Sequence, residues 1–200
     1  MNSKTIKGKS TEAIQTLLDG LMDDGYIPTV AFVFLSIDQD IEATCGVLDR
    51  KNIAVFGATA AGAFVDGEVE EEGIVILLLD IPKSDFQIIC ENSGHGKDRD
   101  AAQATANEAL ERFSNPAFIL GGSSIRADGE MIMKGIMDNC GPQVVICGGM
   151  ASAPPVTGLV TYVFTNAKIF DFGILAFVLN GDHYLIEGLA SCGWKAAGTT

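Results

Sequence analysis

Positive charge is scarce in this sequence, in which 13 lysines and arginines stand against 26 aspartates and glutamates, for a formal net charge of −13. Because so acidic a surface repels phosphate groups, we expect neither nucleic acid nor an anionic membrane as a partner. Long apolar runs are missing too, since the longest end at Asp80 and Asn180 and fall well short of the roughly 20 residues of a membrane-spanning helix. The polar start of the chain, MNSKTIKGKS, has no apolar signal segment, so we expect a cytoplasmic protein.

Cysteine is present, but not in a pattern that indicates disulfides or a zinc site. The chain has five cysteines, an odd number, and no CxxC pair. Cys147 lies in an apolar run, where cysteine behaves as a small hydrophobic residue. We therefore predict a reducing compartment and no metal.

Catalytic and nucleotide-binding motifs are missing as well. The sequence contains no GxxxxGKS or GxxxxGKT, no GxGxxG after a strand pattern, no GxSxG and no HExxH. The two histidines, His95 and His183, have no evident partners, and nothing near Cys192 in the sequence would activate its thiol. These absences predict a protein without catalytic residues and without a cofactor.

What the sequence does contain is a repeated order of strand and helix patterns. In the first half, strands are predicted at 29–35, 52–56, 73–79 and 86–90, and helices from Ser10 or Thr11 and over 38–48. In the second half, the patterns are a helix at 99–113, a strand after Pro116, a helix at 128–140 and a strand at 143–147. The apolar stretch 73–80 matches 173–180, so we predict half-repeats at 11–94 and 100–193 within one domain, residues 1–200.

The strand patterns also predict how the domain is layered. Several strands are apolar at consecutive positions, which indicates that both of their faces are covered. Each half offers about two helices, enough to cover one face of its sheet. We therefore predict an α/β fold of two α-β-α-β-β-β-β halves, whose mixed sheets pack face to face with helices outside in a four-layer α/β/β/α sandwich. One larger mixed sheet with helices on both faces is the alternative.

Two loops rich in Gly, Ala, Ser and Thr follow strand patterns at equivalent positions of the halves, after 52–56 and after 143–147. Such loops let backbone N–H groups approach a ligand, and α/β proteins bind ligands at the C-terminal ends of strands. We predict a pocket for an amino acid or a similar small carboxylate, lined by Gly57, Ala58, Thr59, Gly148, Gly149 and Ser152. Tight packing where the halves meet is the alternative explanation of these small residues.

A third loop, at 121–126, adds Ser123 and Arg126 to the predicted ligand-binding residues. The planar guanidinium of Arg126 can bind a carboxylate through two parallel hydrogen bonds. A surface position without a ligand is the alternative for this arginine.

Three stretches carry a family resemblance. Residues 128–149 (DGEMIMKGIMDNCGPQVVICGG), 56–62 (FGATAAG) and 193–198 (GWKAAG) resemble, in order and spacing, segments of the N-terminal part of the FIST sensory domain. The likeness covers about residues 28–198. The resemblance implies an input module of intracellular signal transduction that binds small ligands such as amino acids.

The sequence departs from this family after the Gly-Gly loop, where the family often carries an acidic residue and this chain has Ala153-Pro154-Pro155. A ligand contact by that acid is therefore not expected. Because the family usually continues into a C-terminal FIST half, such a half or a signalling output protein is an expected partner besides the small-molecule ligand.

Two functions other than a sensor stay open. A hydrolase or transferase is one, because N-terminal-nucleophile hydrolases share the α/β/β/α scaffold. These enzymes need Thr, Ser or Cys at the mature N-terminus, however, and this chain starts Met1-Asn2. A ligand-free scaffold or dimerisation domain is the other.

Overall fold

The computed structural model describes the chain except at residues 66, 124–126, 155–159 and 189–200. Along the described part the elements are β1 (Ser3–Gly8), α1 (Thr11–Asp23), β2 (Val30–Leu35), α2 (Ile41–Arg50), β3 (Ala54–Thr59), β4 (Ala63–Val65), β5 (Glu68–Glu70), β6 (Ile74–Leu79), β7 (Phe86–Asn92), α3 (Asp98–Arg112), β8 (Pro116–Gly122), α4 (Gly129–Cys140), β9 (Ile146–Met150), β10 (Val163–Phe164), β11 (Ile169–Phe170) and β12 (Gly173–Asn180). The predicted α/β class is confirmed. Among the described helices, none has the length and apolar character that crossing a membrane requires.

The strands form two mixed sheets and a separate hairpin. The six-stranded sheet has the order β1-β6-β2-β3-β10-β11, and the four-stranded sheet has the order β7-β12-β8-β9. Each sheet contains one parallel pair joined through a helix, β2-α2-β3 in the first and β8-α4-β9 in the second. β6 and β12, which lie in the matching stretches 73–80 and 173–180, hold corresponding positions antiparallel to β2 and β8.

The shared strand order favours repeat boundaries that differ from 11–94 and 100–193. β7 occupies the same position in the four-stranded sheet as β1 occupies in the six-stranded sheet. β7 therefore belongs to the same repeated unit as the elements that follow it in the sequence. We propose that the repeated units run from β1 to β6 and from β7 to β12. Sequence patterns miss β1, because Ile6 is its one buried residue.

Side-chain caps set the starts of three helices, close to the predicted positions. The hydroxyl of Ser10 and the carboxylates of Asp40 and Asp128 each accept a hydrogen bond from a backbone N–H of the first turn of α1, α2 and α4, respectively. These caps satisfy N–H groups that have no partner inside the helix. α1 then buries Ile14 and Leu18, whose i, i+4 spacing places them on one face.

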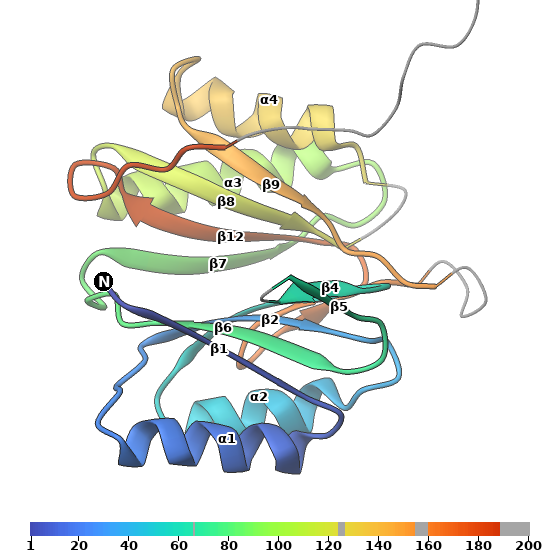
Figure 1. Ribbon diagram of the computed structural model, residues 1–200. Coiled ribbons are helices and arrows are strands. Elements are labelled where there is room, and N and C mark those ends of the chain that lie inside the picture. The colour runs from blue at the N-terminus through green and yellow to red at the C-terminus, as the bar shows by residue number, and fades with distance from the viewer. Residues whose placement is uncertain (66, 124–126, 155–159, 189–200) are drawn as a thin grey trace, which may run out of the picture.

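Figure 1 shows the two sheets facing each other, with α1 and α2 outside the six-stranded sheet and α3 and α4 outside the four-stranded sheet. Clusters of buried apolar side chains fill the spaces between these layers. In the central cluster, the ring centroid of Phe177 in β12 lies 4.9 Å from that of Phe32 in β2 and 5.4 Å from that of Phe86 in β7. Both faces of the central strands are therefore covered, which explains why β2, β6 and β12 are apolar at consecutive positions.

Strand β10 joins the late part of the chain to the first sheet. Its residues pair antiparallel with Gly57 and Ala58 of β3. The side chain of Asn166 extends this contact, since it accepts a hydrogen bond from the backbone N–H of Val55 at 2.8 Å and donates one to the carbonyl of Ile53 at 2.9 Å. The six-stranded sheet is thus completed by residues far away in the sequence.

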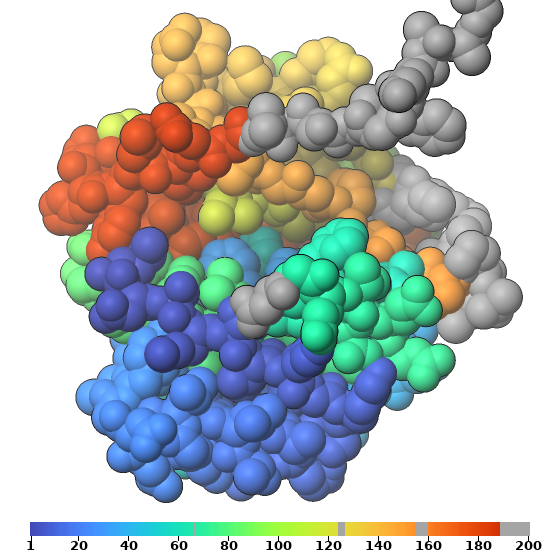
Figure 2. Space-filling view, in the orientation of Figure 1, coloured from blue at the N-terminus to red at the C-terminus, as the bar shows by residue number. Residues whose placement is uncertain are grey.

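The hairpin of β4 and β5 stands apart from both sheets. Figure 2 shows it at the surface, between the blue N-terminal layer and the orange and red C-terminal layer. Its central cross-strand pair, Phe64 and Val69, is apolar and exposed.

Candidate functional site

Most of the small residues predicted to form ligand-binding loops lie inside strands. β3 continues to Thr59 instead of ending at residue 56, and β8 and β9 include their Gly-Gly pairs, at 121–122 and 148–149. β3 continues because β2 pairs with it on one side and β10 on the other. Backbone pairing with two neighbours outweighs the weak strand propensity of Gly and Ala, which is all that a local sequence pattern reports.

The predicted residues of the first half are packed rather than open. A Cβ atom built on Gly57 would lie 2.0 Å from the ring of Phe164, so the ring fills the space beside this glycine. Ala58 is buried, and Thr59 is only 1 % exposed, with its hydroxyl accepting a hydrogen bond from the backbone N–H of Tyr162 at 2.9 Å. For these three residues, the structure favours packing where the halves meet.

The two predicted loops do meet in space. The backbone N–H of Ser152 donates to the carbonyl of Thr59 at 3.0 Å, and the hydroxyl of Ser152 accepts from the N–H of Ala61 at 3.0 Å. The end of β3 and the segment after β9 are therefore adjacent, although their polar groups bind each other.

The third predicted loop contributes a structural serine. Ser123 is fully buried, and its hydroxyl accepts a hydrogen bond at 2.6 Å from the backbone N–H of Gly173, at the start of β12. This contact holds the end of β8 to β12. Arg126, the other residue predicted in this loop, lies outside the described residues.

The remaining predicted residues, Gly148 and Gly149, line a cavity of about 360 Å³ between α4 and the ends of β8 and β9. We call this cavity the glycine groove; it is lined by Leu120, Gly121, Gly122, Gly129, Ile132, Met133, Ile146, Cys147, Gly148, Gly149 and Met150. Glycine backbone and apolar side chains make up its wall. It lies at the C-terminal ends of two parallel strands, where α/β proteins commonly bind ligands.

The two glycines of β9 have different surroundings. Gly148 has φ +148°, and a Cβ on it would lie 2.0 Å from the carbonyl oxygen of Leu120, so only glycine fits there. Gly149 is exposed, and a Cβ on it would have nothing within 4 Å. β9 is also an edge strand, so among the described strands its outer edge has no partner. Gly149 therefore presents open backbone to the groove.

The polar groups of the groove do not favour nucleophilic catalysis or a lone anion. The carboxylate of Asp128 already accepts hydrogen bonds of 3.0 and 3.1 Å from the N–H groups of Glu130 and Met131, the donors that the start of α4 would offer an anion. Burial raises the pKa of the Cys147 thiol, so this cysteine stays protonated at neutral pH. The groove is better suited to apolar contact with some backbone hydrogen bonding.

In the described part of the chain, the other titratable side chains do not form a group that is suited to catalysis. Burial raises the pKa of Cys45 and of Cys90 to about 12. Cys192 lies outside the described residues. In the described ranges, no three His, Cys, Asp or Glu side chains are grouped so that they could hold a metal ion.

One histidine has partners that the sequence did not reveal. Nδ1 of His183 lies 3.3 Å from a carboxylate oxygen of Asp85, and the hydroxyl of Tyr184 donates to the other oxygen at 3.2 Å, so the expectation that His183 has no partner is wrong. Burial acts to raise the pKa of Asp85, but the hydrogen bonds around it outweigh burial and hold that pKa below its usual range. His95 packs on the ring of Phe172 at a centroid distance of 4.1 Å.

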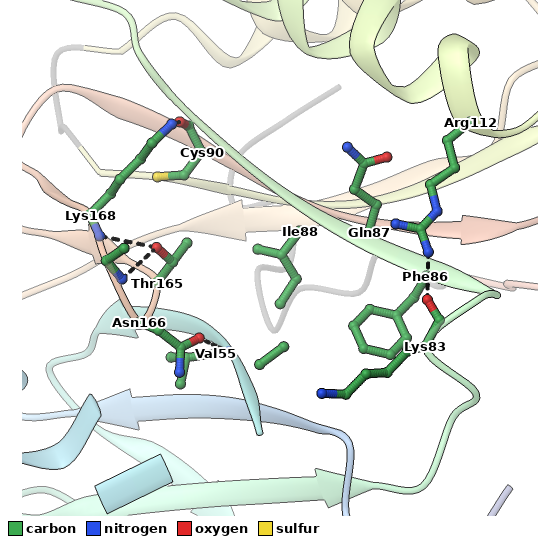
Figure 3. Close-up of a pocket in the computed structure, with 12 residues that line it drawn as sticks. Val55, Lys83, Phe86, Gln87, Ile88, Cys90, Arg112, Thr165, Asn166 and Lys168 are labelled. Atoms are coloured by element: carbon green, nitrogen blue, oxygen red, sulfur yellow. Dashed lines mark hydrogen bonds between the residues drawn. The ribbon is translucent and has the colours of Figure 1, made fainter. Parts of the chain in front are cut away.

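A larger cavity, of about 600 Å³, has β7 on one side and the start of β3 and the β10–β11 turn on the other (Figure 3). We call it the inter-sheet cleft; its lining is Ala54, Val55, Lys83, Phe86, Gln87, Ile88, Cys90, Arg112, Thr165, Asn166, Ala167 and Lys168. Sequence reasoning missed this cleft, because its residues come from four separate segments and none of these carries a recognisable motif. The pairing of β10 with β3 brings the segments together.

Comparison with known families identifies a family for this chain. A family model described as the FIST N domain matches residues 29–200, a range that contains both the glycine groove and the inter-sheet cleft. Comparison with curated proteins gives no match.

Proposed function

The chain belongs to the FIST N domain family of sensory domains, and from this premise we propose that it is the small-ligand-binding input module of an intracellular signal-transduction protein. Family membership supports the sensory role. The binding site and the class of ligand rest on the chain's own residues.

We place the ligand in the glycine groove, and the surroundings of Gly149 carry this proposal. Gly149 combines an exposed backbone, empty space where a side chain would be, and an apolar cavity beside it. Gly148 belongs to the same wall. We leave Gly57, Ala58 and Ser123 out of the proposed site, because they are packed in the core.

An amino acid is the ligand that the groove suits best. Its apolar side chain would lie between Ile132, Met133 and Met150, which line the cavity. Its ammonium group can donate a hydrogen bond to a backbone carbonyl, and its carboxylate can accept one from a backbone N–H. The edge of β9, which has no partner among the described strands, offers both kinds of backbone group. A small carboxylate with an apolar part would use the same contacts.

Gly149→Val tests this proposal. The new side chain has space to enter without a clash, so the variant should fold, while its added bulk beside the open backbone of β9 should hinder the ligand from reaching that backbone. The measurement is the thermal shift of the wild type and the variant across a panel of amino acids and small carboxylates. A ligand at a hundredfold excess over its Kd should stabilise the wild type by roughly 2.7 kcal/mol and the variant hardly at all.

Gly20→Val is the matched control, because Gly20 lies in α1, is exposed and also has nothing within 4 Å of the built Cβ. This variant should respond to the ligand as the wild type does. An equal response of Gly149→Val would remove the groove as the site. A wild type that responds to no compound would favour the ligand-free scaffold instead.

A further inference from the structure

The inter-sheet cleft has an unusual charge for this chain. Acidic residues outnumber basic ones 26 to 13, yet Lys83, Arg112 and Lys168 line the cleft and no aspartate or glutamate is among its described lining residues. Within this strongly acidic protein, the cleft is a local concentration of positive charge. Such a concentration attracts anions even when the net charge does not, because salt screens the distant carboxylates beyond roughly 8 Å.

The positive groups of the cleft are held mainly by neutral oxygens. Nζ of Lys83 donates to the backbone carbonyl and the side-chain oxygen of Asn52, both at 2.8 Å, and Arg112 donates to the backbone carbonyl of Lys83. Nζ of Lys168 donates to the carbonyl of Cys90 at 2.8 Å. These carbonyls orient the cations without neutralising their charge.

No carboxylate is closely paired with these cations among the described residues, although Glu108 accepts a hydrogen bond from the lining residue Gln87 at 2.7 Å. In the described part of the chain, neither Lys83 nor Arg112 has a carboxylate oxygen within 4.0 Å, and Lys168 has only Glu91, at 3.9 Å and at the surface. A guanidinium has five N–H groups and an ammonium has three, so Arg112 and Lys168 keep most of their donors for a ligand, whereas Lys83 already uses two of its three on Asn52.

The cations stand at opposite ends of the cleft. Figure 3 shows Lys168 at one end and Lys83 with Arg112 at the other, while Ile88 and Val55 lie between them. A ligand that matches this order has an acidic group at each end and an apolar middle.

We propose that the inter-sheet cleft is a second binding site of this domain and that its ligand is a small dicarboxylate, with one carboxylate at Lys168 and the other at Lys83 and Arg112. The planar fork of Arg112 can bind a carboxylate through two parallel hydrogen bonds, and the two lysines act as point charges. The apolar chain of the ligand lies over Ile88 and Val55. This site is separate from the glycine groove and does not depend on the function proposed for it.

Isothermal titration calorimetry with linear dicarboxylates from succinate to suberate tests the proposal, with the monocarboxylate of equal length and inorganic phosphate as comparisons. The wild type should bind at least one dicarboxylate about tenfold or more tightly than the matching monocarboxylate, because each charged hydrogen-bonding end adds to the affinity. Lys168→Gln and Arg112→Gln should each remove this advantage. Both side chains are exposed, so neither change should unfold the protein.

Lys134→Gln is the matched control, because this exposed lysine pairs with Glu130 on α4 and takes no part in the cleft. It should leave the dicarboxylate affinity unchanged. Three results would overturn the proposal: no binding of any dicarboxylate, equal binding of mono- and dicarboxylates or of phosphate, or an equal loss of affinity in Lys134→Gln. Gly149→Val, the variant that tests the glycine groove, should bind the dicarboxylate normally, so the two sites are tested separately.

Discussion

The ring of Phe164 occupies the space in which a side chain of Gly57 would begin. A Cβ built on Gly57 would lie 2.0 Å from Cε2 of this ring, and the two residues are partners in the pairing of β3 with β10. We expect Gly57→Ala to lower the free energy of unfolding by about 1–3 kcal/mol, because the added methyl group overpacks the core. Urea denaturation followed by circular dichroism measures this change.

Phe164→Leu is the partner variant for this prediction. It should destabilise the protein when introduced alone, but in the double variant the smaller side chain should accept the methyl group of Gly57→Ala. The coupling between the two changes in a double-mutant cycle is then favourable. Strictly additive losses would show that Phe164 does not limit the space at residue 57.

The contact between the sheets depends on the aromatic cluster around Phe177. This side chain is 1 % exposed and lies against Phe32 of the opposite sheet. Phe177→Ala should lower the free energy of unfolding by about 3–5 kcal/mol, since it removes a buried ring and leaves a cavity. Phe64→Ala, at a position that is 85 % exposed, is the control and should cost less than about 0.5 kcal/mol. Comparable losses in the two variants would contradict the central position of Phe177.

The pair of Arg99 and Asp138 holds α3 to α4 and should make stability depend on pH. Nε and Nη2 of Arg99 donate to the two carboxylate oxygens of Asp138 at 2.8 and 2.9 Å, and the arginine holds the pKa of this carboxyl below its usual value. A lowered folded-state pKa contributes stability above the unfolded-state pKa of about 4, and the contribution is lost as the pH falls through the folded-state pKa.

Urea unfolding of the wild type and of Asp138→Asn across this pH range checks the prediction. The wild type should be the more stable protein at pH 7, and the difference should shrink as the medium becomes acidic. Arg99→Gln should remove most of the same pH-dependent part, while the hydrogen bond of 2.8 Å from Gln103 to Asp138 preserves the rest. A difference that stays constant with pH would show that the ion pair is not its cause.

Much of the fold is readable from local sequence patterns. The four helices lie close to the predicted ranges, because amphipathic spacing and capping residues such as Ser10 and Asp128 are encoded within a few positions. The matched stretches 73–80 and 173–180 identify β6 and β12, because a strand buried on both faces must be apolar along its whole length.

The predicted site was harder to read, because small residues serve two purposes that look alike in a sequence. Gly57 leaves room for a ring that comes from residue 164, and Gly149 leaves its own backbone open. Nothing close to either glycine in the sequence distinguishes these surroundings. The difference arises from strand β10, whose pairing with β3 joins residues more than a hundred positions apart.

The pairing of β10 with β3 has a consequence for how the chain is made. When residues 54–59 leave the ribosome, the residues that will cover their free edge have not been synthesised, since they lie at 163–164. Until then β3 has unpaired backbone groups along one edge, and most of its side chains are apolar. A strand of this kind tends to associate with other chains. The first unit therefore cannot complete its sheet by itself during translation, because β3 gains its second neighbour only after residues 163–164 have emerged.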